Sequence, residues 1–134
     1  MNLKTLVEEG YSILNGRIVD FSIESTGTAL VSKVIIEGDN WTCNFGIYDL
    51  LRSDFNGLLF IKGLMDVLES SKISDLTGKI VRLAAKPDEQ VKIIGNILYD
   101  VWLNCEDYES KDSDLEDTEI QVNNNEDELI EEEE

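Results

Sequence analysis

The chain offers few side chains that could carry out chemistry. It contains no histidine, which removes the commonest general base, the commonest metal ligand and the usual pH-sensitive group. Its two cysteines, Cys43 and Cys105, belong to no metal-binding spacing, so we expect two free thiols. No serine lies in a nucleophile motif, and no glycine-rich loop is present to hold a phosphate. We therefore predict a protein that is not an enzyme and that uses no cofactor or metal.

Carboxylates are the one reactive group in excess. Asp39, Asp49 and Asp54 flank a predicted strand and could meet at one end of a sheet to hold a divalent ion. Turn and helix-cap roles account for the same residues more simply. Clustered carboxylates with a bound ion are the feature that would identify an enzyme instead.

The acidic residues are unevenly distributed along the chain. Of the net charge of −18, residues 1–104 contribute −4, from 14 acidic and 10 basic side chains. Residues 105–134 contribute −14, with Lys111 as their one base. Because this second segment is also poor in apolar residues, we predict a disordered acidic tail. The bases elsewhere are scattered among acids, so we expect no direct binding of nucleic acid.

The length of 134 residues allows one domain, which we place at residues 1–104, with the tail at 105–134. The N-terminal segment has acids where a signal peptide would need an apolar run. No stretch is long and apolar enough to span a membrane. The expected location is therefore the cytoplasm, that of the host cell if the protein comes from a phage.

The clearest predicted element is an amphipathic helix at residues 57–71. Its apolar residues recur at helical spacing and form one stripe: Leu58, Phe60, Ile61, Leu64, Met65, Val67 and Leu68. Lys62, Asp66 and Glu69 fall on the opposite side. A helix with that much apolar surface must pack on something, and the strand-like segments around it are the candidates.

Those segments predict about five antiparallel strands. They lie at residues 17–23, 28–37, 41–47, 79–85 and 91–98. Asn15-Gly16 is a strong hairpin signal and predicts a turn before the first strand. Gly95 inside the last strand suggests a bulge. The predicted fold class is α+β: an antiparallel sheet of about five strands packed against one main helix, with a disordered acidic C-terminal tail.

Residues 12–104 resemble a family of small uncharacterised phage and prophage proteins. The matching segments are Gly27 in the first hairpin, Phe45-Gly46 before Asp49-Leu50, the helix 60–68, Leu76–Arg82 and Ile94–Trp102. The chain departs from that family at residues 37–44, where the family has a glycine-rich stretch, and in its acidic tail. The resemblance implies an origin in a mobile element and carries no catalytic residues.

Charge and resemblance together indicate a phage anti-defence protein of the anti-CRISPR kind. We expect it to bind a basic, nucleic-acid-binding protein of the host or its defence system, with a nucleic-acid-guided nuclease as the favoured target, and to cover that surface as a DNA mimic. The candidate partner-binding residues are acids, to pair with Arg or Lys, and aromatic anchors: Asp39, Trp41, Asp49, Asp54, Asp100, Trp102, Glu106, Asp107, Tyr108 and Glu109.

Two other classes of function remain open. A domain that sequesters a small molecule or nucleotide would show a pocket lined by the aromatic residues of the third strand. A phage structural or assembly factor would show a large apolar patch and a fixed homo-oligomer.

Overall fold

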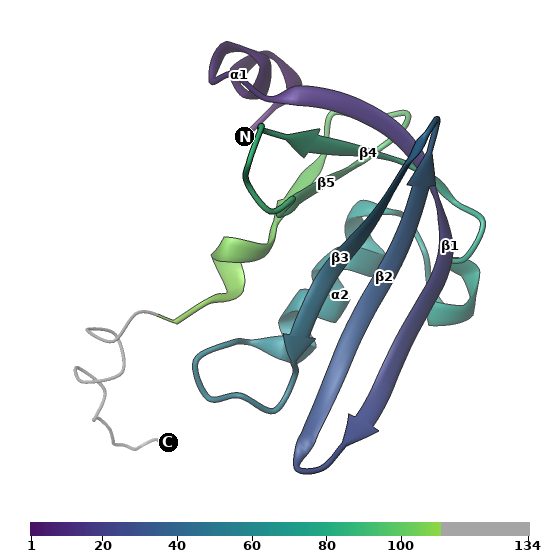
Figure 1. Ribbon diagram of the computed structural model, residues 1–134, viewed down its shortest axis with the longest axis vertical. Coiled ribbons are helices and arrows are strands. Elements are labelled where there is room, and N and C mark those ends of the chain that lie inside the picture. The colour runs from purple at the N-terminus through teal and green to yellow at the C-terminus, as the bar shows by residue number, and fades with distance from the viewer. Residues whose placement is uncertain (111–134) are drawn as a thin grey trace.

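The described part of the chain folds into one antiparallel sheet with a main helix packed on it, which confirms the α+β class (Figure 1). The computed structural model describes residues 1–110. The strands are β1 (Ser12–Thr26), β2 (Ala29–Gly38), β3 (Trp41–Asp49), β4 (Ile80–Ala85), β5 (Ile93–Asn96) and β6 (Trp102–Asn104), in the sheet order β3-β2-β1-β4-β5-β6. The helices are α1 (Leu3–Glu8), α2 (Gly57–Val67) and the 3₁₀ turns η1 (Ile73–Asp75) and η2 (Cys105–Tyr108). The prediction of about five strands omits the short β6.

The long strand β1 joins the two halves of the sheet. Its residues 12–17 pair with β4, and residues from 17 to 26 pair with β2. The predicted turn at Asn15-Gly16 is therefore wrong, because both residues lie inside β1 opposite Arg82 and Val81. A Cβ at position 16 would come within 2.7 Å of the Trp41 ring. Glycine is needed here to make room for that ring.

Two hydrophobic cores lie on opposite faces of the sheet. Successive side chains of a strand point to opposite faces, so neighbouring residues divide between the cores. Leu83 on β4 packs in the larger core beneath α2, whereas Ala84 packs in the smaller core with Leu6 of α1. The sheet is thus covered on one face by α2 and, over β4–β6, on the other by α1.

Helix α2 is shorter than predicted, and it turns the predicted apolar side inward except at Leu58. It ends at Val67, and Glu69 has a left-handed φ of 56°, which stops the predicted continuation to residue 71. Phe60, Ile61 and Leu64 are buried as expected, but Leu58 is 81 % exposed. Its position in the first turn of α2 carries it past the edge of the core.

Gly95 forms no bulge. It pairs in register with Arg82 on β4 and Trp102 on β6, and the Trp102 ring lies where its side chain would be. Most of the predicted acidic tail, residues 111–134, lies outside the described residues, and residues 105–108 form η2. Among residues 1–110, no helix has the length and apolar character needed to cross a membrane.

Candidate protein-binding surface

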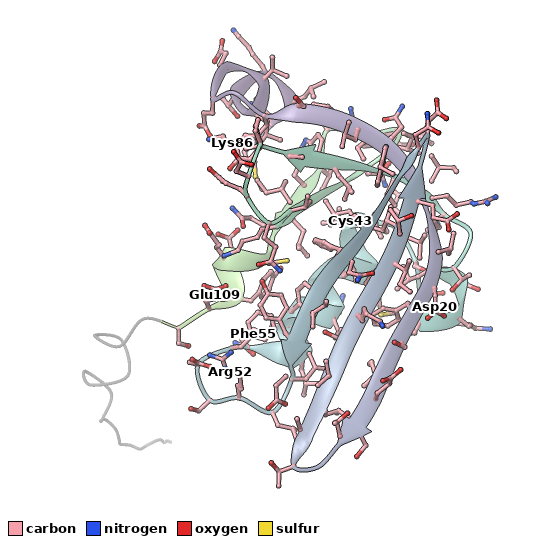
Figure 2. The ribbon with its side chains drawn as sticks, viewed as in Figure 1. Asp20, Cys43, Arg52, Phe55, Lys86 and Glu109 are labelled. Carbon is pink, nitrogen blue, oxygen red and sulfur yellow. The ribbon has the colours of Figure 1, made fainter. Side chains whose placement is uncertain are left out.

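Four of the predicted acids gather where the described chain ends. The loop after β3 and the segment around η2 are held together by backbone hydrogen bonds, from Asn56 N to Tyr108 O at 2.7 Å and from Ser110 N to Asp54 O at 2.9 Å. Phe55 and Glu109 form an isolated β-bridge between the same segments. We call Asp54, Glu106, Asp107 and Glu109 the acidic end; Arg52, Phe55 and Glu109 mark it in Figure 2.

Two bases lie among these four acids. The Arg52 Nε donates to Asp54 Oδ1 at 2.7 Å, and its Nη2 donates to the other carboxylate oxygen. This fork of hydrogen bonds lowers the pKa of Asp54. The Lys92 Nζ lies 3.3 Å from Glu106 Oε2 and 3.9 Å from Glu109 Oε2. Sequence reasoning placed neither base at this surface. Arg52 is only two residues from Asp54, so its pairing could be suggested locally, whereas Lys92 meets Glu106 and Glu109 only through the fold.

Aromatic side chains pack beneath the acidic end. The rings of Tyr48 and Phe55 stack with centroids 4.1 Å apart, and Tyr108 meets Phe60 edge-on at 5.9 Å. The Tyr108 hydroxyl also lies against Gly63 of α2, where a Cβ would come within 2.2 Å of it. Tyr108 is therefore a packing residue that attaches η2 to α2, and it is half-buried.

The buried thiol of Cys105, beneath this surface, is unreactive. Burial raises the pKa of Cys105 to about 12, and burial likewise raises the pKa of the neighbouring Tyr48. Both groups therefore stay protonated at neutral pH, and a protonated thiol is a poor nucleophile. Cys43 and Cys105 are both free, and burial raises the pKa of Cys43 as well.

Three further predicted residues, Asp49, Asp100 and Trp102, have structural roles. Asp49 Oδ1 accepts from the backbone N–H groups of Leu30 and Leu51, each at 3.1 Å, and so ties the end of β3 to the start of β2. Asp100 Oδ1 accepts from Leu3 N at 2.7 Å and from the Trp102 indole at 2.6 Å. Trp102 itself is buried under the Arg82 guanidinium, 4.8 Å from its ring centroid. These residues hold the fold and are removed from the candidate surface.

The Asp100 contacts predict a pH-dependent stability. The Trp102 hydrogen bond, chiefly, lowers the pKa of Asp100. A carboxyl with a lowered folded-state pKa stabilises the fold above its unfolded value of about 3.9, and this stabilisation is lost as the pH falls through the folded-state pKa. Asp100→Asn should therefore lower the denaturation midpoint at pH 7, and its difference from the native protein should shrink below about pH 4.

Denaturant titrations between pH 7 and pH 3 check this result. Asp20→Asn, at an exposed acid on β1, is the matched control. A difference between native protein and Asp100→Asn that stays constant down to pH 3 would contradict the assignment.

Asp39 and Trp41 lie apart from the acidic end. Asp39 is in the β2–β3 turn, and Trp41 packs over Gly38 and Gly16 at the start of β3. Asp39 and Asp49 are thus at opposite ends of β3, so the predicted meeting of Asp39, Asp49 and Asp54 does not occur. No group of three potential metal ligands is found within residues 1–110.

One cavity touches an aromatic residue of the third strand. It has a volume of about 180 Å³ and is lined by Tyr48, Arg52, Asp54, Phe55, Glu109 and Ser110. Ligand pockets for small molecules usually measure about 300–1,000 Å³ and are mostly apolar. A cavity of this size beside an Arg–Asp pair gives little support to the small-molecule alternative.

Comparison of the chain with protein-family models, with curated proteins and with solved structures found no significant match.

Proposed function

We propose that this protein is a non-enzymatic inhibitor that binds a basic, nucleic-acid-binding surface of another protein and blocks access of nucleic acid to it. The observation that supports this proposal is the distribution of negative charge along the chain. Fifteen of the 29 acidic residues fall within residues 105–134, and three of them, Glu106, Asp107 and Glu109, belong to the acidic end. Duplex DNA carries about one charge per 1.7 Å of its axis. A dense run of carboxylates would compete for the same arginines and lysines.

The target class follows from the phage resemblance of residues 12–104. A phage protein of this character would act on a host or defence protein, and a nucleic-acid-guided nuclease holds its heteroduplex in a positively charged channel. The acidic end would form the folded part of the contact, and the acidic tail would speed encounter by steering. Of the ten predicted residues, Asp54, Glu106, Asp107, Glu109 and Asp39 remain candidates for pairing with the partner's bases.

The test measures DNA binding and cleavage by a purified guided nuclease after incubation with the full-length protein. We expect competition with DNA, and we expect affinity to fall by at least about tenfold between 50 and 200 mM salt, as for contacts that displace counterions. A full-length variant with the twelve acids of residues 112–134 changed to Asn or Gln should associate more slowly. The nuclease's rate of association with each protein is read by surface-based kinetics.

A matched control changes only the folded surface. Asp54 is left in place, because Arg52 donates to both of its carboxylate oxygens, and Glu106, Asp107 and Glu109 are changed to their amides. This variant should retain the fast encounter but dissociate sooner, since mutations at the contact act mainly on dissociation. A complex indifferent to salt, or an amide-substituted tail that associates at the native rate, would contradict the proposal.

A structural or assembly role is the second candidate, and one observation favours it. Leu51, Leu58 and Leu59, on the β3–α2 loop and the first turn of α2, are 65 %, 81 % and 55 % exposed. A fixed homo-oligomer in sedimentation at high salt, dissociated by Leu58→Ser, would select this role over the inhibitor.

A further inference from the structure

We propose that the free edge of β3 is a strand-docking site, at which an extended, cationic segment of the partner adds to the sheet. The inference rests on the proposed function, because it states how the folded domain would hold a basic partner. Strand addition of this kind uses main-chain hydrogen bonds for affinity and side-chain positions for selectivity.

The backbone of β3 has hydrogen-bonding groups to offer. Within residues 1–110, β3 is the last strand on its side of the sheet, and β2 is its neighbour. Gly38 and Trp41 close the two-residue hairpin, so their backbones exchange hydrogen bonds. Hydrogen-bonded pairs alternate along an antiparallel ladder, so the backbone groups of Cys43 and Phe45 also point toward β2. The N–H and C=O groups of Thr42 and Asn44 therefore point to the free edge. Among residues 1–110, neither residue contributes to the backbone hydrogen bonds found outside the ladders.

Residues 41–45 of this edge also lack the features that usually protect an edge strand from pairing. Lysine, proline, inward charges and bulges protect natural edge strands. Residues 41–48 contain no charged residue and no proline, and the irregularity in the β2–β3 pairing comes after Phe45. By contrast, the part of β1 beyond Ile18 has no partner on its β4 side within residues 1–110, and it carries Asp20, Glu24 and a bulge.

An added strand would complete a partly covered face. Val34 and Ile36 on β2 are fully buried, whereas Cys43 and Trp41, on the same face of β3, are only half-buried. The side chains of a further strand would cover them. Thr42 and Asn44 are exposed on the opposite face and would stay accessible to polar neighbours.

Charge selects a cationic occupant. Glu37 and Asp39 lie at the hairpin end of β3, and Tyr48 near its other end stacks on Phe55. The acidic end, marked by Arg52, Phe55 and Glu109 in Figure 2, lies beyond that second end. A segment laid along β3 thus meets carboxylates at both ends and a neutral middle. A second copy of this chain is disfavoured, since each copy carries a net charge of −18.

The test uses full-length protein and two synthetic peptides of equal length and charge. One alternates lysine and valine and can form a strand; the other has the same sequence with every backbone nitrogen methylated, so it has no N–H to donate in a ladder. Asn44→Pro removes an N–H that the β2 ladder does not use. Asn44→Lys adds a positive charge that repels a cationic strand from the edge. Thr28→Lys, on the exposed β1–β2 turn, makes the same charge change away from the edge.

We expect the lysine–valine peptide to bind the native protein and Thr28→Lys alike, and both Asn44 variants at least about tenfold more weakly. Equal binding of the two peptides, or native-like binding by both Asn44 variants, would overturn the docking site while leaving the salt-sensitive function intact. A salt-resistant dimer of the protein that Asn44→Lys dissociates would also overturn it, in favour of a second copy. If neither peptide binds at low salt, the docking site and the proposed function both fail.

Discussion

Replacing Phe60 with alanine should lower the free energy of unfolding by about 3–5 kcal/mol, the usual cost of removing a buried aromatic ring. Phe60 is fully buried, and its ring contacts three other aromatic rings, those of Phe55, Tyr48 and Tyr108, at centroid distances of 5.4, 5.6 and 5.9 Å. These rings come from β3, from the loop that follows it and from η2. The alanine variant would thus leave a cavity where all three segments meet α2.

The measurement is the denaturation midpoint in urea, with its slope checked to confirm two-state behaviour. Leu58→Ala is the matched control, because Leu58 lies two residues away on the same helix and is 81 % exposed. It should change stability by no more than about 0.5 kcal/mol. Similar losses in the two variants would mean that α2 does not pack through Phe60.

The main elements of this fold follow from local pattern. Helical spacing of apolar residues in 57–67 and alternation in residues 19–23 of β1 and in β3 can each be seen within one segment. Gly16 could not be assigned in this way. Its neighbour Trp41 is 25 positions later in the sequence, and only the paired strands bring the ring over the glycine. An Asn-Gly pair in a strand therefore looks the same as one in a turn until the sheet is assembled.

From the sequence, the candidate surface could be predicted only as an excess of acidic residues, without their positions. An excess of acids predicts an acidic surface, but it does not separate free carboxylates from those used inside the fold. Asp100 accepts from Leu3, 97 positions away, and no local pattern marks that contact. Conversely, Asp54 and Glu109 lie together because a bridge between Phe55 and Glu109 joins distant segments. The free backbone of Thr42 and Asn44 depends on strand order, which the sequence does not specify.

The glycine at position 46 should be almost as sensitive as Phe60. Gly46 has a left-handed φ of 67°, and its carbonyl accepts from the buried Ser32 hydroxyl at 2.7 Å. A Cβ there would lie 2.9 Å from Cζ of Phe60. Gly46→Ala therefore combines backbone strain with overpacking, and we expect a loss of about 2–4 kcal/mol in the free energy of unfolding.

Gly27 separates these two contributions. It has a similar φ of 59°, but a Cβ at this position meets no atom within 4 Å. Gly27→Ala should therefore show the backbone strain alone, about 1–2 kcal/mol. In a Phe60→Leu background the overpacking is relieved, so the cost of Gly46→Ala should fall toward that of Gly27→Ala. Equal costs for Gly46→Ala in both backgrounds would show that Phe60 does not press on Gly46, and the close approach of α2 to β3 would then have to be abandoned.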